Sequence, residues 1–183
     1  MNFLFLDIDD VFNTPAHARA VAATRRYSPN DPGSMLDPEA VRLFCDWLEG
    51  HDDLNLVLSS TWRHHYALEE VRDAFREHDP RFPDFFGKTG KRHPRFSGFW
   101  RDIEILDWLR AQGLDARRVR FAVLDDWPGY GSGKPNLVEP VLVRVHPLYG
   151  LTASDLYRVD QCLSLENPLA GIDWDYYLQE SAL

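Results

Sequence analysis

Apolar residues gather in short runs along the chain, and polar residues follow most of these runs directly. Short runs rich in aromatic and branched residues predict strands that are buried on both faces of a sheet. We expect strands at residues 3–6, 54–58, 119–126 and 141–145, with a weakly marked strand near Phe85. The polar residues that follow them are then candidates for chemistry, because ligands of open α/β sheets bind outside the carboxyl ends of the strands.

Between these runs, apolar residues recur at helical spacing. Helices are expected at about residues 16–24, 37–50, 68–75, 100–113 and 152–163. The second helix has the clearest ends, since Asp37 is a good N-cap, Pro38 suits the first helical position and Gly50 provides the stop. The alternation of strands and helices implies parallel pairing and a three-layer α/β/α sandwich of Rossmann-like form, with a mainly parallel central sheet.

Length and composition set the outline of the molecule. With 183 residues, of which 44% are hydrophobic, the chain can form one domain with a sizeable core. We expect a single domain over residues 1–183, with a small flap at residues 14–36, where Pro and Gly are frequent, and a tail after about residue 165. Cys45 and Cys162 lie far apart in helical patterns, which indicates neither a disulfide nor a zinc site. No membrane span or leader is recognisable, so a cytoplasmic protein is expected.

The first strand ends in Asp7 and Asp9. Two carboxylates one residue apart repel each other unless they share a proton or a cation, and oxygen ligands of this kind suit a hard divalent ion such as Mg²⁺. An isolated pair of this type can equally cap a helix or lie in a solvated loop. The metal interpretation is favoured because two other predicted strands also end in polar residues, namely Ser59, Ser60, Asp125 and Asp126.

In this order, the motifs resemble those of the haloacid dehalogenase (HAD) superfamily of aspartyl-phosphate phosphatases and phosphotransferases. The segment Leu-Ser-Ser-Thr-Trp-Arg at residues 58–63, with Arg-Asp-Ile-Glu-Ile at residues 101–105, is also similar to the HAD domain of Swiss Army Knife RNA-repair proteins. The resemblance covers roughly residues 3–163. It implies the HAD fold with a minimal cap, Mg²⁺ as cofactor and a phosphorylated substrate as partner.

The resemblance also implies roles for the acidic residues. Asp7 is expected to attack phosphorus and form an aspartyl-phosphate, which divides a slow hydrolysis into two displacements. Asp9 is expected to act as general acid and then general base, and to bind the metal through its backbone carbonyl while its carboxyl group stays free. Asp126 is the expected direct metal ligand, with Asp125 supporting it.

Two further parts of the expected site are less definite. Ser59 or Ser60 is expected to donate a hydroxyl group to the phosphoryl oxygens, and the sequence leaves the choice open. The family's usual lysine of the third motif is missing, and Arg101 occupies the matching place, where its planar fork can hold phosphate and carboxylate oxygens together. Lys88 and Lys91 remain alternatives for this role.

The net charge of −9 argues against strong nonspecific binding to nucleic acid, which depends on Lys and Arg. Two local basic stretches, Arg25–Arg26 and Lys88–Arg95, are either solvated loops or guides for phosphate groups. The candidate substrate-binding residues are Trp62, Arg63, Lys88 and Trp127.

The expected function is therefore a Mg²⁺-dependent phosphomonoester hydrolase that acts on nucleotides or nucleic-acid ends. A phosphatase of a small metabolite is the alternative within the enzyme class, and the oligomeric state stays open. Asp10 occupies the position where many family members have glycine. Its side chain can bond the turn or add charge that disfavours some substrates, and if the charge instead destroys the metal geometry, the protein is a noncatalytic binding module.

Overall fold

A parallel sheet forms the centre of the molecule. The computed structural model describes residues 1–23, 31–90, 101–127, 136–166, 168–169 and 171–172. Within them the strand order is β3-β2-β1-β4-β5, and every neighbouring pair is parallel. The strands are β1 (Asn2–Leu6), β2 (Leu54–Leu58), β3 (Gly87–Lys88), β4 (Arg120–Asp125) and β5 (Leu142–Arg144). This sheet confirms the predicted Rossmann-like α/β fold, and it brings the carboxyl ends of β1, β2 and β4 to one edge.

Helices alternate with the strands, as the apolar spacing predicts. They are α1 (Pro15–Ala23), α2 (Pro38–Leu48), α3 (Leu68–Arg76), α4 (Arg101–Ala111) and α5 (Ala153–Ser164). Shorter 3₁₀ turns are η1 (Pro32–Met35), η2 (Thr61–His64) and η3 (Glu139–Val141). Asp37 caps α2 as expected, because its carboxylate accepts a hydrogen bond from the backbone N–H of Glu39.

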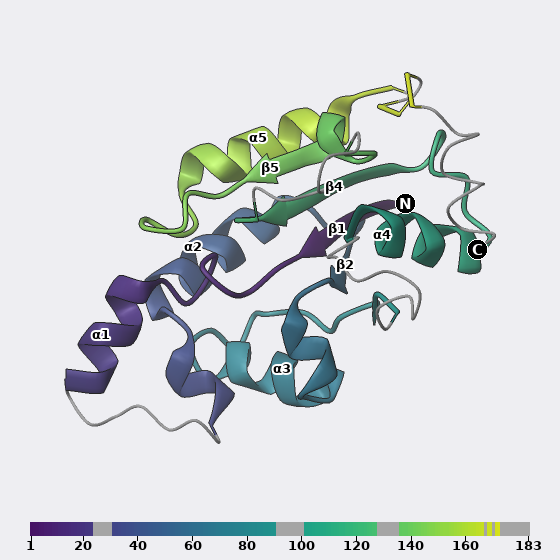
Figure 1. The fold of residues 1–183 in the computed structure, drawn as a ribbon. Helices are drawn as coiled ribbons and strands as arrows, with labels where there is room; N and C mark the ends of the chain where they lie inside the picture. Colours follow the sequence, from purple (N-terminus) through teal and green to yellow (C-terminus); the bar gives the residue numbers. More distant parts are fainter. Residues whose placement is uncertain (24–30, 91–100, 128–135, 167, 170, 173–183) are drawn as a thin grey trace.

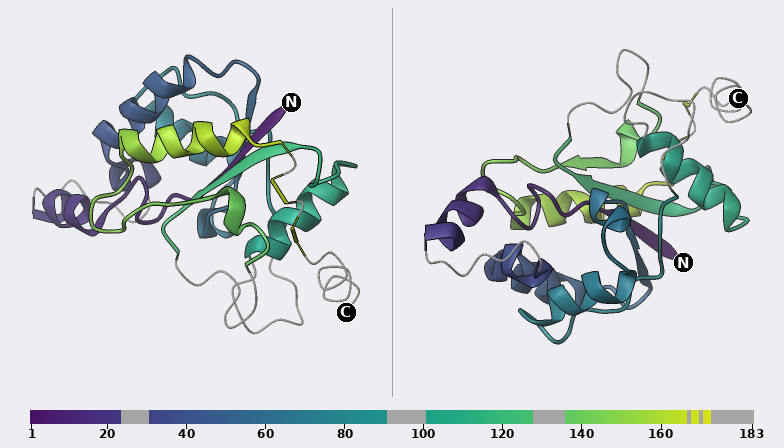
Figure 2. Two further views of the ribbon diagram at one scale, coloured as in Figure 1. Left: turned by 90° about the horizontal axis from the view of Figure 1, so that it is seen from above. Right: turned by 60° about the horizontal axis from the view of Figure 1, so that its bottom comes forward.

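Alternate residues of β1 point to opposite faces of the sheet and join two separate cores. Leu4 and Leu6 pack on the side of α2, α3 and α5, whereas Phe3 and Phe5 pack on the side of α4. Figure 1 shows α4 in front of the central strands and α2 behind them. Helix α1 buries none of its residues and lies at one end of the molecule in both views of Figure 2. The described elements thus form the predicted three layers.

The predicted strand bounds differ from the observed ones by at most two residues. The third strand, expected near Phe85, is Gly87–Lys88, and Phe86 before it already donates its backbone N–H to the carbonyl of Leu56 over 2.8 Å. The side chain of Phe85 packs against the core. Strand β4 ends at Asp125. The basic stretches at residues 25–26 and 91–95 lie outside the described residues.

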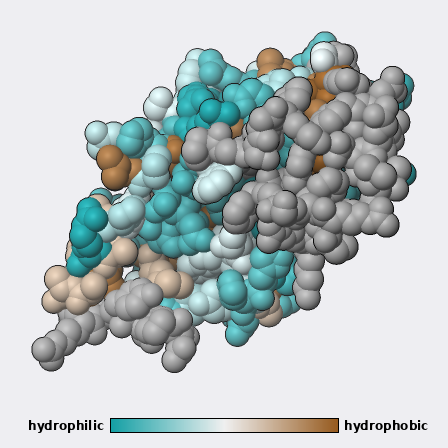
Figure 3. Space-filling model, in the orientation of Figure 1, coloured by the Kyte–Doolittle hydropathy of each residue, from teal (hydrophilic) through white to brown (hydrophobic). Residues whose placement is uncertain are grey.

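The described surface is mostly hydrophilic on the face that Figure 3 shows, with hydrophobic residues scattered over it. No helix among the described residues is long and apolar enough to cross a membrane. Cys45 and Cys162 are both free thiols, in agreement with the expectation that they form no disulfide.

Candidate active site

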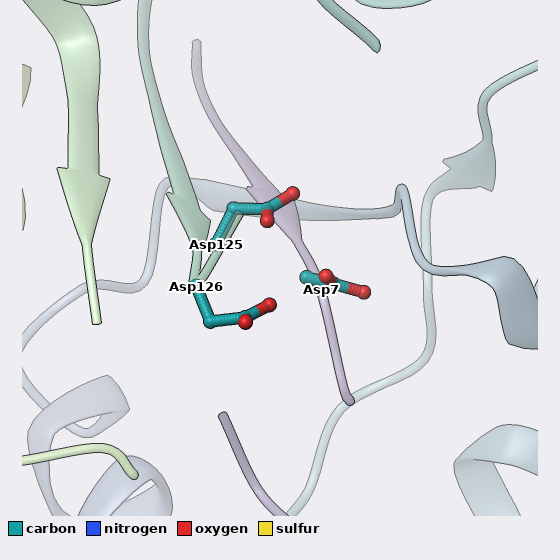
Figure 4. Close-up of side chains that lie close together, drawn as sticks. All are labelled: Asp7, Asp125 and Asp126. Carbon is teal, nitrogen blue, oxygen red and sulfur yellow. The ribbon is translucent and has the colours of Figure 1, made fainter. Parts of the chain in front are cut away.

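Three aspartates meet at the carboxyl edge of the sheet. Asp7 directly follows β1, and its backbone N–H donates to the carbonyl of Leu124 in β4, so it lies beside Asp125. One carboxylate oxygen from each of Asp7, Asp125 and Asp126 lies within 4.8 Å of the other two. Figure 4 shows the three carboxyl groups gathered between the ends of β1 and β4. The sheet therefore brings together carboxylates that are far apart in the sequence.

Arg101, from the helical layer that contains α4, bridges two of these carboxylates. It is the first residue of α4, and its Nη1 lies 3.0 Å from Asp7 Oδ2 and 2.8 Å from Asp125 Oδ2. The other oxygen of Asp125 accepts the backbone N–H of Trp127 over 2.8 Å. Charge-assisted bonds of this kind are short and strong, so both oxygens of Asp125 are fixed while one guanidinium bridges two acids.

The environment of the acids disfavours their charged forms. Burial and the nearby charge of Asp125 raise the pKa of Asp7 to about 7, although Arg101 acts in the opposite direction. Burial, together with Asp7 and Asp10, raises the pKa of Asp126 to about 6. Carboxyl groups that resist ionisation in this way gain most from a bound cation, which stabilises the charged form.

A small cavity opens beside these acids. Its volume is about 220 Å³. The residues that line it are Asp7, Asp9, Asp10, Thr61, Arg101, Asp126 and Trp127. Trp127 is 41% exposed, so an aromatic residue borders a cavity that is lined mainly by acids.

Comparison with protein families matches residues 3–156 to the HAD domain in Swiss Army Knife RNA repair proteins. The chain belongs to this HAD family. Comparison with curated proteins and with solved structures gives no significant match. Family membership points to a HAD-type phosphatase or hydrolase, and HAD proteins generally use Mg²⁺.

In this HAD domain the carboxyl group of Asp9 is not free, contrary to expectation. Its Oδ2 accepts the hydroxyl of Thr61 over 2.8 Å, and its Oδ1 accepts the indole N–H of Trp62 over 2.9 Å and the amide of Asn13 over 3.0 Å. Asn13 lies four residues after Asp9, and Thr61 and Trp62 directly follow the two serines. The turns after β1 and β2 bring these three donors together around Asp9. The carboxyl group is therefore held in one orientation beside the cavity.

The two serines have different surroundings. Ser59 donates its backbone N–H to Leu6 over 2.9 Å and so lies beside Asp7. Its hydroxyl is fully buried and has no hydrogen-bond partner among the described residues. The hydroxyl of Ser60 instead caps η2 by accepting the backbone N–H of Trp62. Of the two hydroxyls, that of Ser59 is the one not already used.

Three of the four predicted substrate-binding residues do not line the cavity. Trp62 is 5% exposed and holds Asp9. Arg63 is buried, contacts the carbonyls of the two serines and pairs with Glu104 of α4 over 2.5 Å. Lys88 is exposed, and its Nζ lies 3.3 Å from the carbonyl of Arg63. The structure thus brings Arg101, and not Lys88, to Asp7, and of the four it brings Trp127 to the cavity.

Sequence reasoning missed Thr61 and Asn13. Both lie inside the motifs after β1 and β2, and neither carries a charge. Thr61 directly follows Ser60, and Asn13 lies four residues after Asp9. These spacings indicate donors to Asp9 only when the turn geometry is known. Side-chain directions in such turns depend on backbone angles that the sequence pattern does not specify.

Proposed function

We propose that the protein is a Mg²⁺-dependent phosphomonoester hydrolase that forms an aspartyl-phosphate on Asp7. The observation that carries the proposal is the buried carboxylate of Asp7 at the end of the central strand, 3.0 Å from the guanidinium of Arg101 and beside two further acids. A nucleophilic carboxylate, a fixed cation and a divalent-ion site in one cavity match what phosphoryl transfer requires, which is positioning and charge stabilisation.

The donor set supports the proposed metal. Asp7 and Asp126 offer carboxylate oxygens, and burial with repulsion from nearby acids raises their pKa values, so a cation between them would stabilise their charged forms. We assign the direct contacts to these two residues and to the backbone carbonyl of Asp9. Asp125 supports them, since both of its oxygens already accept hydrogen bonds. When bound, the ion supplies positive charge to the phosphoryl oxygens.

The residues then act in two steps. A carboxylate oxygen of Asp7 attacks phosphorus in line, the bond to the leaving oxygen breaks, and Asp9 gives that oxygen a proton. Water next attacks the aspartyl-phosphate, Asp9 takes a proton from it, and inorganic phosphate and free Asp7 result. Arg101 and the buried hydroxyl of Ser59, which has no hydrogen-bond partner among the described residues, hold the phosphoryl oxygens, where charge develops.

For the substrate we propose nucleotides or nucleic-acid ends. The family description names RNA repair proteins, and Trp127 offers an exposed aromatic surface at the cavity on which a base can stack. The metabolite phosphatase stays the alternative, because a cavity of about 220 Å³ also suits a small phosphate ester.

The test is a phosphate-release screen with Mg²⁺ over mononucleotides, phosphorylated oligonucleotides and sugar phosphates. We expect release from wild type and none from Asp7→Asn, because the amide has nearly the same shape but is a poor nucleophile. Excess chelator should also stop release. Turnover by Asp7→Asn at the wild-type rate, or full activity in chelator, would refute the mechanism.

The same screen separates the substrate classes. We expect a phosphorylated oligonucleotide to be cleaved more efficiently than the matching mononucleotide, with an advantage that shrinks as salt rises, since phosphate contacts release counterions. Equal efficiencies, or a preference for a sugar phosphate, would favour the metabolite alternative. Binding without turnover of any ester would favour the noncatalytic module.

A further inference from the structure

Asp10 has an unusual backbone conformation. Its φ is 56°, and it is the one non-glycine residue with positive φ among the described residues. This left-handed region disfavours side chains, although Asp and Asn tolerate it better than most residues. The conformation is held by a hydrogen bond of 2.7 Å from the backbone N–H of Asp10 to Oδ1 of Asn13. A glycine would satisfy the same turn without strain, so the side chain has to be explained separately.

Asp10 lies in the wall of the cavity, and its carboxyl group has no partner among the described residues. Asp10 is one of the lining residues, and its carboxyl group forms no hydrogen bond or ion pair within the described part of the chain. It is also not among the three aspartates whose oxygens gather closely enough to share an ion. Within the described part of the chain, no cation therefore neutralises the carboxylate of Asp10.

The described lining of the cavity carries little positive charge. Its lining contains four carboxylates and one guanidinium, that of Arg101, which already contacts Asp7 and Asp125. In the proposed function, the scissile phosphoryl group would interact with this guanidinium and with the metal. Asp10 directly follows Asp9, the residue that protonates the leaving oxygen in the proposed function. A second anionic group bound in the cavity thus meets the carboxylate of Asp10 and no further cation of the described lining.

We propose that Asp10 is a specificity-determining residue that rejects phosphoanhydrides. Nucleoside diphosphates and triphosphates carry a second phosphate one bridging oxygen from the scissile one, and like charges placed together suppress binding of the wrong partner. In a monophosphate or at a polynucleotide end, a sugar follows the scissile phosphate instead. This inference rests on the proposed function, and it excludes nucleoside diphosphates and triphosphates from the substrates.

The test compares kcat/KM for a nucleoside monophosphate and for the corresponding diphosphate. Asp10→Asn removes the charge but keeps the shape and the tolerance of positive φ. It should shift the ratio toward the diphosphate by about tenfold or more. Asp10→Gly should shift it in the same direction. The matched control is Asp52→Asn, the same loss of charge at an exposed residue before β2, at the other end of the sheet. It should leave the ratio unchanged.

Titration calorimetry with inorganic phosphate and with pyrophosphate, at constant Mg²⁺, gives a readout that needs no turnover. Asp10→Asn should bind pyrophosphate more tightly relative to phosphate than wild type does. Turnover with an unchanged substrate ratio and unchanged pyrophosphate affinity would overturn the role of Asp10 alone. Failure of wild type to release phosphate from any ester would overturn the proposed function, and the specificity role with it.

Discussion

Arg101 holds together two carboxylates that would otherwise repel each other. Its side chain is 10% exposed, and those of Asp7 and Asp125 are 5% and 0% exposed. Removing one partner from a buried charge group is costly, by about 3–5 kcal/mol, because the remaining charges lose their compensation. Arg101 thus contributes to the stability of the site as well as to the charge that the proposed reaction needs.

Arg101 and Lys88 can be separated by kinetics. Arg101→Ala should lower kcat by at least about two powers of ten, comparable with the loss of one preorganised donor. Lys88→Ala should change kcat little, because Lys88 is exposed and its Nζ contacts a carbonyl of η2 and not an acid of the site. Steady-state assays below the unfolding temperature of each variant give the comparison, with Arg101→Lys as the charge-preserving control. The opposite ranking would assign the third motif to Lys88.

The two serines differ in the same testable way. Ser59→Ala should reduce kcat/KM by about tenfold or more with little loss of stability, since its buried hydroxyl has no partner to lose among the described residues. Ser60→Ala should mainly destabilise the protein, by roughly 1 kcal/mol, because it removes an N-cap. Denaturant unfolding and kinetics on both variants distinguish the roles. Equal kinetic losses would show that neither hydroxyl is specific to the reaction.

At the scale of elements, the turn after β1 depends on a glycine in a distant loop. Gly150, which precedes α5, has a φ of 66°, and a Cβ there would lie 2.5 Å from Cγ2 of Thr14 and 3.0 Å from the carbonyl oxygen of Val11. The next residue, Leu151, donates its backbone N–H to that same carbonyl over 2.9 Å. The loop before α5 therefore packs against the turn that carries Asn13, one of the donors to Asp9.

This packing predicts unequal effects for two chemically identical substitutions. Gly113 has a φ of 72° with nothing within 4 Å of its Cβ position, so Gly113→Ala costs only the left-handed conformation, about 1–2 kcal/mol. Gly150→Ala adds the overlap with Thr14 and Val11, typically about 1–3 kcal/mol more, and should also lower kcat through the displaced turn. Urea unfolding and kinetics test both. Similar losses of stability and activity in the two variants would contradict the coupling.

The elements were largely predictable, and the contacts between their ends were not. The apolar runs located β1, β2 and β4 because buried parallel strands leave a continuous hydrophobic signal. The two-residue β3 leaves almost none. For the site, strand order placed the acids Asp7, Asp125 and Asp126 at one edge, but whether Trp62 and Arg63 face the cavity depends on the 3₁₀ turn after β2. The sequence pattern predicted neither their burial nor the donors around Asp9.

For the whole molecule, the raised pKa values of the acidic site predict that folding depends on pH. The pKa values of Asp7 and Asp126 are about 7 and about 6 in the folded state, against an ordinary 3.8. The folded protein therefore binds protons that the unfolded chain has already released. By linkage, the stability that this cluster contributes to the metal-free protein is fully present below the ordinary pKa of 3.8. It is lost as the pH rises from there toward about 7.

Mg²⁺ should therefore stabilise the protein more at about pH 8 than at about pH 5, because at the higher pH the carboxylates are ionised and no proton competes. At about one hundred times Kd the gain is about 2.7 kcal/mol, or roughly 5–10 °C in Tm for a chain of this size. Thermal unfolding in Mg²⁺ and in chelator at both pH values measures this gain in Tm.

As a control, Asp126→Asn removes one repelling charge and one proposed ligand. In chelator at about pH 8 it should be more stable than wild type, and it should respond little to Mg²⁺. An equal Mg²⁺ response at the two pH values, or an undiminished response in Asp126→Asn, would show that the ion binds elsewhere.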